Sequence, residues 1–215
     1  MVIHRSRCAQ SAGYNDASLT PSRSAVAIPH PHHLFTVDDY YRMAESGILR
    51  EDDRVELIDG EIIAMAPIGP GHAGTVEDLG DRLRAVLPAS ARLRSQNPVH
   101  LGLRAEPDPD LVIVKRREDG YRTEHPQPAD VLLLIEVADS SLVYDRQTKA
   151  PMYARAGIPE LWIVNLIDRA IEVYRDPSPV GYQTVTVARR GEDLQPLAFP
   201  DVSIAVSDVL IEPGR

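Results

Sequence analysis

The amino-acid sequence predicts an α/β domain with a mixed central β-sheet flanked by helices. Segments with helical spacing alternate along the chain with segments of strand character. Two of the strand segments, residues 111–114 and 131–137, are nearly all apolar, which is typical of central strands covered on both faces. An Asp-Gly pair at residues 59–60 separates two alternating segments and is a strong β-hairpin signal.

The N-terminal region is expected to hold a tail and then a helix. The chain of 215 residues is long enough for one domain with a substantial core and a tail. Residues 1–33 combine Ser, Ala, Pro and Arg without the apolar core of a signal peptide, so we expect a mobile tail there and a single domain over residues 34–215. Thr36 is a good N-cap, two aspartates follow it, and Gly47 can end the helix.

The later elements follow from turn residues and apolar spacing. The Asp-Gly pair joins expected strands at residues 54–58 and 61–65. A helix is expected over residues 72–87, where apolar residues recur at spacings of three and four and Pro88 follows. Beyond it we expect strands within residues 92–103 and at 111–114, 131–137 and 161–164, with a second core helix over residues 144–156. An antiparallel pair is expected at residues 171–175 and 182–188, and a last strand around residues 197–204.

Composition limits the class of protein. The net charge of -9 and the pI near 5.2 argue against a protein that coats nucleic acid by bulk charge, although they allow an enzyme with a local basic rim. No stretch approaches the roughly 20 apolar residues that span a bilayer, so no membrane partner is expected. The single cysteine, Cys8, fits a reducing compartment, and the expected location is cytoplasmic.

Two acids and a lysine indicate a site for phosphodiester chemistry. Asp110 opens one apolar run and Glu136 interrupts another, and a charge in such a run is costly unless it is paired or bound to a metal. If the two strands are neighbours, the carboxylates can supply the oxygen ligands that Mg²⁺ prefers, and the ion can activate water. Lys149, on the following helix, can orient the water or stabilise developing negative charge.

These residues also carry a family resemblance. Pro109-Asp110, Glu136-Val137-Ala138 and Lys149 resemble the PD-(D/E)XK nuclease superfamily, and more closely the chain resembles the Uma family of restriction-type endonucleases. The most distinctive matching stretch is Tyr-Ala-Arg-Ala-Gly-Ile-Pro-Glu-Leu-Trp-Ile-Val at residues 153–164. The other matching stretches are residues 55–62, 109–111, 129–137 and 144–149.

The resemblance implies a restriction-endonuclease-like core and assigns roles within it. Asp110 and Glu136 are implied to bind the metal, and Glu56, from the first hairpin or the helix feeding it, is implied to join them. In the superfamily pattern the lysine lies two residues after the acid, where this chain has Ala138. The Uma family resembles this chain in placing the lysine on the following helix, which implies that Lys149 takes its role.

Each principal residue also has a purely structural interpretation. Glu136 can be a salt-bridged structural acid, and Asp110 can simply start a strand after a proline turn. Lys149 can pair with Asp145 across one helical turn as a surface bridge. Glu56 can be a solvated hairpin residue, because its two neighbours would then face inward.

His72 and Gln96 are secondary candidates. His72 follows Gly-Pro-Gly at an expected helix start, where it can contact a phosphate or the metal shell, or merely begin the helix. Gln96 lies on the strand that precedes Asp110 and can point into the site.

The predicted function is metal-dependent endonucleolytic hydrolysis of DNA with Mg²⁺ or Mn²⁺. One alternative is a non-catalytic nuclease-fold module that binds nucleic acid or has a regulatory role, which Ala138 and the acidic net charge favour. Another is a metal-dependent hydrolase of a different phosphate ester. A homodimer is expected, because the alternating hairpin over residues 170–190 presents an edge that needs covering.

Overall fold

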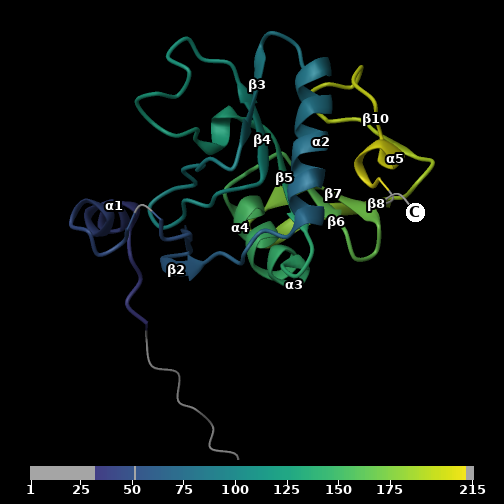
Figure 1. Ribbon diagram of the computed structural model, residues 1–215. Helices are drawn as coiled ribbons and strands as arrows, with labels where there is room; N and C mark the ends of the chain where they lie inside the picture. The colour runs from purple at the N-terminus through teal and green to yellow at the C-terminus, as the bar shows by residue number, and fades with distance from the viewer. Residues whose placement is uncertain (1–31, 51, 212–215) are drawn as a thin grey trace, which may run out of the picture. The chain divides into compact units, whose positions relative to one another are not determined.

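The computed structural model describes residues 32–50 and 52–211 (Figure 1). The mobile tail expected over residues 1–33 lies, except for its last two residues, outside the described part of the chain, as does Cys8. A compact unit begins at His33 and contains every element named below.

A six-stranded mixed sheet forms the centre of this unit, as the sequence predicts. Its strand order is β3-β4-β5-β6-β7-β8, in which β5 and β6 are parallel and all other neighbours are antiparallel. The strands are β3 (Ala91–Ser95), β4 (Leu111–Lys115), β5 (Val131–Ala138), β6 (Glu160–Asn165), β7 (Ala170–Ser178) and β8 (Gly181–Ala188). The predicted hairpin is confirmed as a separate two-stranded sheet of β1 (Val55–Ile58) and β2 (Glu61–Ala64), with Asp59 and Gly60 both at positive φ.

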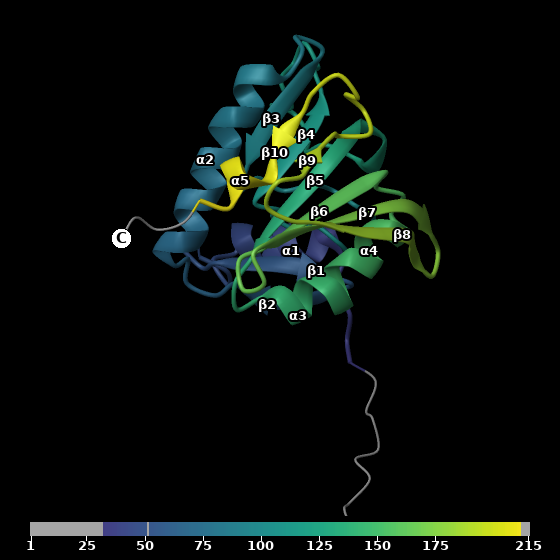
Figure 2. The same cartoon turned by 90° about the vertical axis from the view of Figure 1, so that its right-hand side faces the viewer.

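Helices α2 (Pro70–Val86) and α4 (Ala150–Arg155) cover opposite faces of the six-stranded sheet (Figure 2). The other helical elements of the unit are α1 (Val37–Glu45), the 3₁₀ turn η1 (Pro128–Asp130), α3 (Leu142–Tyr144), the π-helical turn η2 (Asp145–Lys149) and α5 (Val206–Val209). Apolar residues of α2 pack with the odd-numbered side chains of β4 and β5, such as Leu111 and Ile135. Residues of α4 pack with the even-numbered ones, such as Val112 and Leu134, so strands buried on both faces read as continuous apolar runs.

The structure differs from the expected elements at three places. Helix α2 begins at Pro70 rather than at His72, because proline suits the first helical turn. The expected helix over 144–156 contains a π-turn and begins earlier, with α3. The strand expected around 197–204 is wrong except at its end: β10 (Ile204–Ala205) pairs with β9 (Asp193–Leu194), while Pro196 and Pro200 fall in turns and lack the N–H that a strand needs.

Within residues 32–50 and 52–211, none of the helices combines the length and the apolar character needed to cross a bilayer.

Candidate active site

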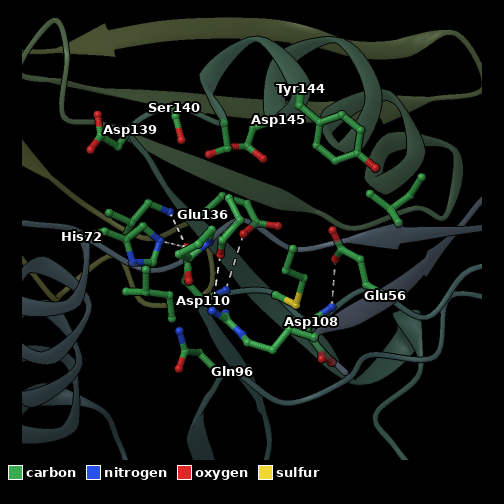
Figure 3. Close-up of a pocket in the computed structure, with 18 of the residues that line it drawn as sticks. Glu56, His72, Gln96, Asp108, Asp110, Glu136, Asp139, Ser140, Tyr144 and Asp145 are labelled. Atoms are coloured by element: carbon green, nitrogen blue, oxygen red, sulfur yellow. Dashed lines mark hydrogen bonds and ion pairs between the residues drawn. The ribbon is translucent and has the colours of Figure 1, made fainter. Parts of the chain in front are cut away.

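A pocket of about 350 Å³ lies where the start of β4, the end of β5, the start of α2 and the η2 turn meet (Figure 3). In Figure 3, Asp139, Ser140, Asp145 and Tyr144 lie along one side of the pocket, across from Gln96 and Asp108. The pocket is strongly acidic. Its carboxylates are Glu56, Asp108, Asp110, Glu136, Asp139 and Asp145, and its basic side chains are Arg54, His72 and Lys149.

Asp110 joins three elements at the pocket wall. It directly precedes β4, and its Oδ2 accepts a hydrogen bond of 2.8 Å from the backbone N–H of Val137 on β5. The same oxygen lies 3.0 Å from Nε2 of His72 on α2. This hydrogen bond raises the pKa of His72 above its ordinary value, although partial burial opposes the shift. Asp110 is therefore held by several partners rather than merely starting a strand.

Glu136 lies beside Asp110 because β4 and β5 pair with Leu111 opposite Ile135. The side chain is buried, and its Oε1 accepts hydrogen bonds from Lys149 Nζ at 3.2 Å and from the Tyr153 hydroxyl at 2.6 Å. Burial raises the pKa of Glu136, and Lys149 offsets this shift only in part. Glu136 is thus paired, as its structural interpretation requires, but within a pocket that holds further acids.

Lys149 bridges two carboxylates. Its ammonium lies 3.1 Å from Oε2 of Glu56 and 3.2 Å from Oε1 of Glu136, and the side chain is only 8% exposed. The surface bridge to Asp145 is therefore the wrong interpretation of this lysine, and the solvated hairpin is the wrong interpretation of Glu56, which is 4% exposed. Burial by itself lowers the pKa of Lys149, but the two glutamates outweigh it and raise the pKa, so the amine stays protonated.

The π-turn explains how the lysine reaches the sheet. In η2 the backbone N–H of Ala150 bonds the carbonyl of Asp145, five residues earlier, which widens the turn at this point. Lys149 and Tyr153 then approach the same oxygen of Glu136 from one face, as their spacing of four predicts.

The secondary candidates both line the pocket. His72 is the third residue of α2 and also contacts Asp110, so it combines the two roles that the sequence leaves open. Gln96 follows β3 with φ of 49° and is exposed, and its backbone N–H bonds the carbonyl of Asp110 at 3.0 Å. The left-handed backbone at Gln96 ends β3 where the pocket begins.

Three acids of the pocket, Asp108, Asp139 and Asp145, are absent from the sequence-based candidates. Asp108 accompanies Asp110 in the run Pro-Asp-Pro-Asp, and burial next to Glu56 raises its pKa to about 6. Asp145 accepts a bond of 2.7 Å from the Ser141 hydroxyl, and burial raises its pKa as well. The doubled Pro-Asp and the spacing of four from Lys149 were the available signals, and neither is specific.

The carboxylate oxygens that line the pocket are of the chemical type that binds hard cations such as Mg²⁺. Among the described residues, three bonded carboxylates each keep one oxygen without a hydrogen-bond donor, namely Asp110 Oδ1, Glu56 Oε1 and Asp145 Oδ1. Both oxygens of Glu136 accept hydrogen bonds, Oε2 from the backbone N–H of Asp110 at 3.4 Å. Asp108 Oδ1 is buried without any partner. Unsatisfied anionic oxygens and raised carboxyl pKa values are what a bound cation relieves. No three acidic, cysteine or histidine side chains in the described ranges converge as a ready-made metal site.

Comparisons with known proteins agree with this fold. A solved structure described as a "putative nuclease belonging to DUF820" from Anabaena variabilis superposes with a TM-score of 0.65 at 17% identity, covering 82% of this chain and 97% of that chain, which shows a shared fold. No curated protein sequence matches the chain. The family model Uma2, described as "Putative restriction endonuclease", matches residues 37–207. The resemblance seen in the sequence is thereby confirmed, and the chain belongs to the Uma2 family.

Proposed function

We propose that this protein is a metal-dependent endonuclease that hydrolyses phosphodiester bonds in DNA. The observation that carries the proposal is that one pocket brings together four residues that are distant in sequence, Glu56, Asp110, Glu136 and Lys149. The family to which the chain belongs is described as restriction endonucleases, which supports the same function. A phosphodiester is anionic, so an acidic pocket binds it only with cations that neutralise both partners.

A divalent cation supplies that neutralisation and lowers the pKa of water that it binds. Asp110 and Glu136 would hold it, with Glu56 as a further ligand. Mg²⁺ or Mn²⁺ fits because the available donors are carboxylate oxygens. Asp108 and Asp145 add negative charge around the same pocket.

Lys149 would act as a fixed positive charge. Because its amine stays protonated between two glutamates, it cannot serve as a general base. An ammonium in that position can donate a hydrogen bond to a phosphate oxygen or orient the attacking water. Tyr153 holds Glu136 in place through its hydroxyl, which burial keeps protonated by raising its pKa.

Cleavage of supercoiled plasmid with Mg²⁺ or Mn²⁺ tests the proposal. Asp110→Ala and Lys149→Ala are expected to lower the rate by about 10²–10³-fold, because each removes charge at the reacting phosphate. Asp201→Ala and Arg42→Ala remove exposed charges that do not line the pocket and should cleave like the parent. Thermal unfolding of every variant separates lost chemistry from lost structure.

The outcomes distinguish the alternative functions. Equal cleavage by the parent and both pocket variants would remove the assigned site. DNA binding without cleavage at any metal concentration would favour the non-catalytic module. If the protein hydrolyses a nucleotide or another small phosphate ester but leaves plasmid uncleaved, it is a hydrolase of a different phosphate ester.

A homodimer belongs to the same proposal. Strand β8 is an edge strand without a charged residue, and its Val185 and Val187 are about half exposed. Uncharged edges favour pairing with another strand, and two copies would supply two active sites for two DNA strands. Light scattering at micromolar concentration is expected to give the dimer mass, and a monomer throughout would contradict this part.

A further inference from the structure

Three arginines converge on one turn at the other end of β3 from the pocket. Arg92 Nη1 lies 3.4 Å from the carbonyl oxygen of Gly120, and Arg122 Nη1 lies 3.2 Å from that of Asp119. Arg94 lies over the ring of Tyr121, with 5.5 Å from its guanidinium carbon to the ring centroid. We name Arg92, Arg94 and Arg122 the arginine cluster.

Within the described ranges, no ion pair joins the cluster to an acidic side chain. Among the described residues, the side-chain hydrogen bonds of the three guanidiniums go only to two backbone carbonyls and to the amide oxygen of Asn97. Arg94 Nε is buried without any acceptor, and the charge of Arg92 helps burial to lower the pKa of Arg94. Like charges held together without an acid are costly unless an anion joins them.

The neighbouring acids are already engaged. Arg117, whose guanidinium carbon also lies near the Tyr121 ring at 4.9 Å from the centroid, forms ion pairs with Asp119 at 2.9 Å and with Glu124 at 2.7 Å. Asp119 and Glu124 thus pair with Arg117 rather than with the cluster, and Asp130, whose charge also acts on Tyr121, accepts a hydrogen bond from the backbone N–H of Gln127. This concentration of cations is unexpected in a chain of net charge -9.

The turn is built to bring the guanidiniums together. Gly120 has φ of 63°, and a β-carbon there would lie 2.7 Å from Arg92 Nη1 and 3.4 Å from Arg122 Nη1. Tyr121 also adopts a left-handed backbone, and its hydroxyl bonds the carbonyl of Lys115 at 2.6 Å. The positive φ favours glycine here, and a β-carbon would push the tip of the Arg92 side chain away from the turn.

The geometry points to a phosphate-binding site at the arginine cluster, which holds the backbone of DNA whose scissile phosphate lies in the pocket. Strand β3 leads directly from one to the other, since Gln96 at its end lines the pocket. The four residues from Arg92 to Gln96 rise about 13 Å, which is about four base pairs of duplex. The identity of the anion as DNA rests on the proposed function, whereas the demand for an anion rests on the cluster alone.

Salt-dependent DNA binding tests the site. The probe is a fluorescent 30-base-pair duplex followed by anisotropy in EDTA, where hydrolysis cannot interfere, from low to physiological NaCl. Each phosphate contact contributes about 0.9 to the slope of log Kobs against log salt. Arg92→Ala/Arg122→Ala is therefore expected to lower the slope by about 2 and the affinity by about 10-fold. Arg42→Ala/Arg189→Ala makes the same charge change at exposed positions and should change both far less.

The outcomes are decisive for the cluster independently of catalysis. Arg92→Lys/Arg122→Lys keeps the charge and should keep most of the slope, and unfolding midpoints identify any misfolded variant. Identical slopes for the cluster and control variants would overturn the site, as would cluster-dependent binding to phosphatidylglycerol vesicles with none to DNA. Absence of plasmid cleavage together with a cluster-dependent salt slope would overturn the proposed chemistry and leave this site standing.

Discussion

Glu136 and Glu172 occupy equivalent places on the sheet but different electrostatic environments. Glu136 on β5 and Glu172 on β7 both pair with Ile163 on the strand between them, β6. They therefore belong to one row across three strands, with Cα atoms about 10 Å apart. Both receive a cation from the same π-turn, because Arg146 reaches Glu172 and Lys149 reaches Glu136. Position, residue type and helix are shared, so the difference lies in what else surrounds each carboxylate.

Glu172 is fully partnered. The guanidinium of Arg146 bonds both of its oxygens, and the Tyr174 hydroxyl and the Asn165 amide add further bonds of 2.8 and 3.1 Å. Burial alone would raise the pKa of Glu172, but these donors outweigh burial and lower it.

Glu136 instead shares its lysine with Glu56 and faces Asp110 and Asp145. Its pKa is raised where that of Glu172 is lowered. The contrast teaches that burial of a charge does not identify a functional site. A surplus of acidic over basic side chains identifies a functional site better, because a structural ion pair is most stable when its charges are balanced.

The largest expected difference between the two glutamates is in activity. Glu136→Gln is expected to lower plasmid cleavage by about 10²–10³-fold, since it removes a charge from the proposed metal site. Glu172→Gln, the matched change in the same row, should retain the parental rate per folded molecule. Similar losses in both variants would show that the rate depends on the sheet rather than on the pocket.

Stability should show the opposite ranking. Arg146→Ala leaves Glu172 buried with neutral donors only, and we expect a loss of about 2 kcal/mol in the free energy of unfolding, reduced because the arginine is partly exposed. Urea denaturation at pH 7.5 measures it, with Arg42→Ala as the exposed control. An unfolding free energy equal to that of the control would show that Glu172 needs no cation.

The smallest expected effect concerns pH. The folded pKa of Asp108 is raised to about 6 from 3.8, so its stabilising contribution is present below about pH 4 and lost as pH rises through about 6. Without metal, Asp108→Asn should therefore stabilise the protein by about 1–2 kcal/mol at pH 7.5 and by about half as much at pH 5. Glu172, with its lowered pKa, contributes in the opposite sense, because its stabilisation is lost as pH falls.

Urea denaturation of Asp108→Asn at the two pH values provides the test, with Asp201→Asn as an exposed control. If Asp108→Asn leaves the pH dependence of the unfolding free energy unchanged, the proposed electrostatic cost of a charged Asp108 is wrong.

Much of the fold could be predicted because the decisive signals are local. The Asp-Gly turn gives the hairpin, and the runs at β4 and β5 give strands buried on both faces. The segment over 197–204 misled because its apolar residues suggest a strand while Pro196 and Pro200 prevent one.

The site was less accessible to sequence reasoning. Asp110 and Glu136 stood out as charges in apolar runs, and their catalytic roles remain predictions. Asp145 lies in the π-turn and lines the pocket, and its spacing of four from Lys149 was too unspecific a signal to place it there. The difference between Glu136 and Glu172 was likewise hidden, since it depends on partners that three-dimensional packing supplies.

Calorimetric titration with Mn²⁺ at pH 7.5 tests most directly whether the acid surplus holds a cation. The parent and Glu172→Gln are expected to bind Mn²⁺ with the same stoichiometry and affinity, whereas Asp110→Asn and Glu136→Gln should lose the binding heat. Equal binding by all four proteins, or binding by none, would contradict the account.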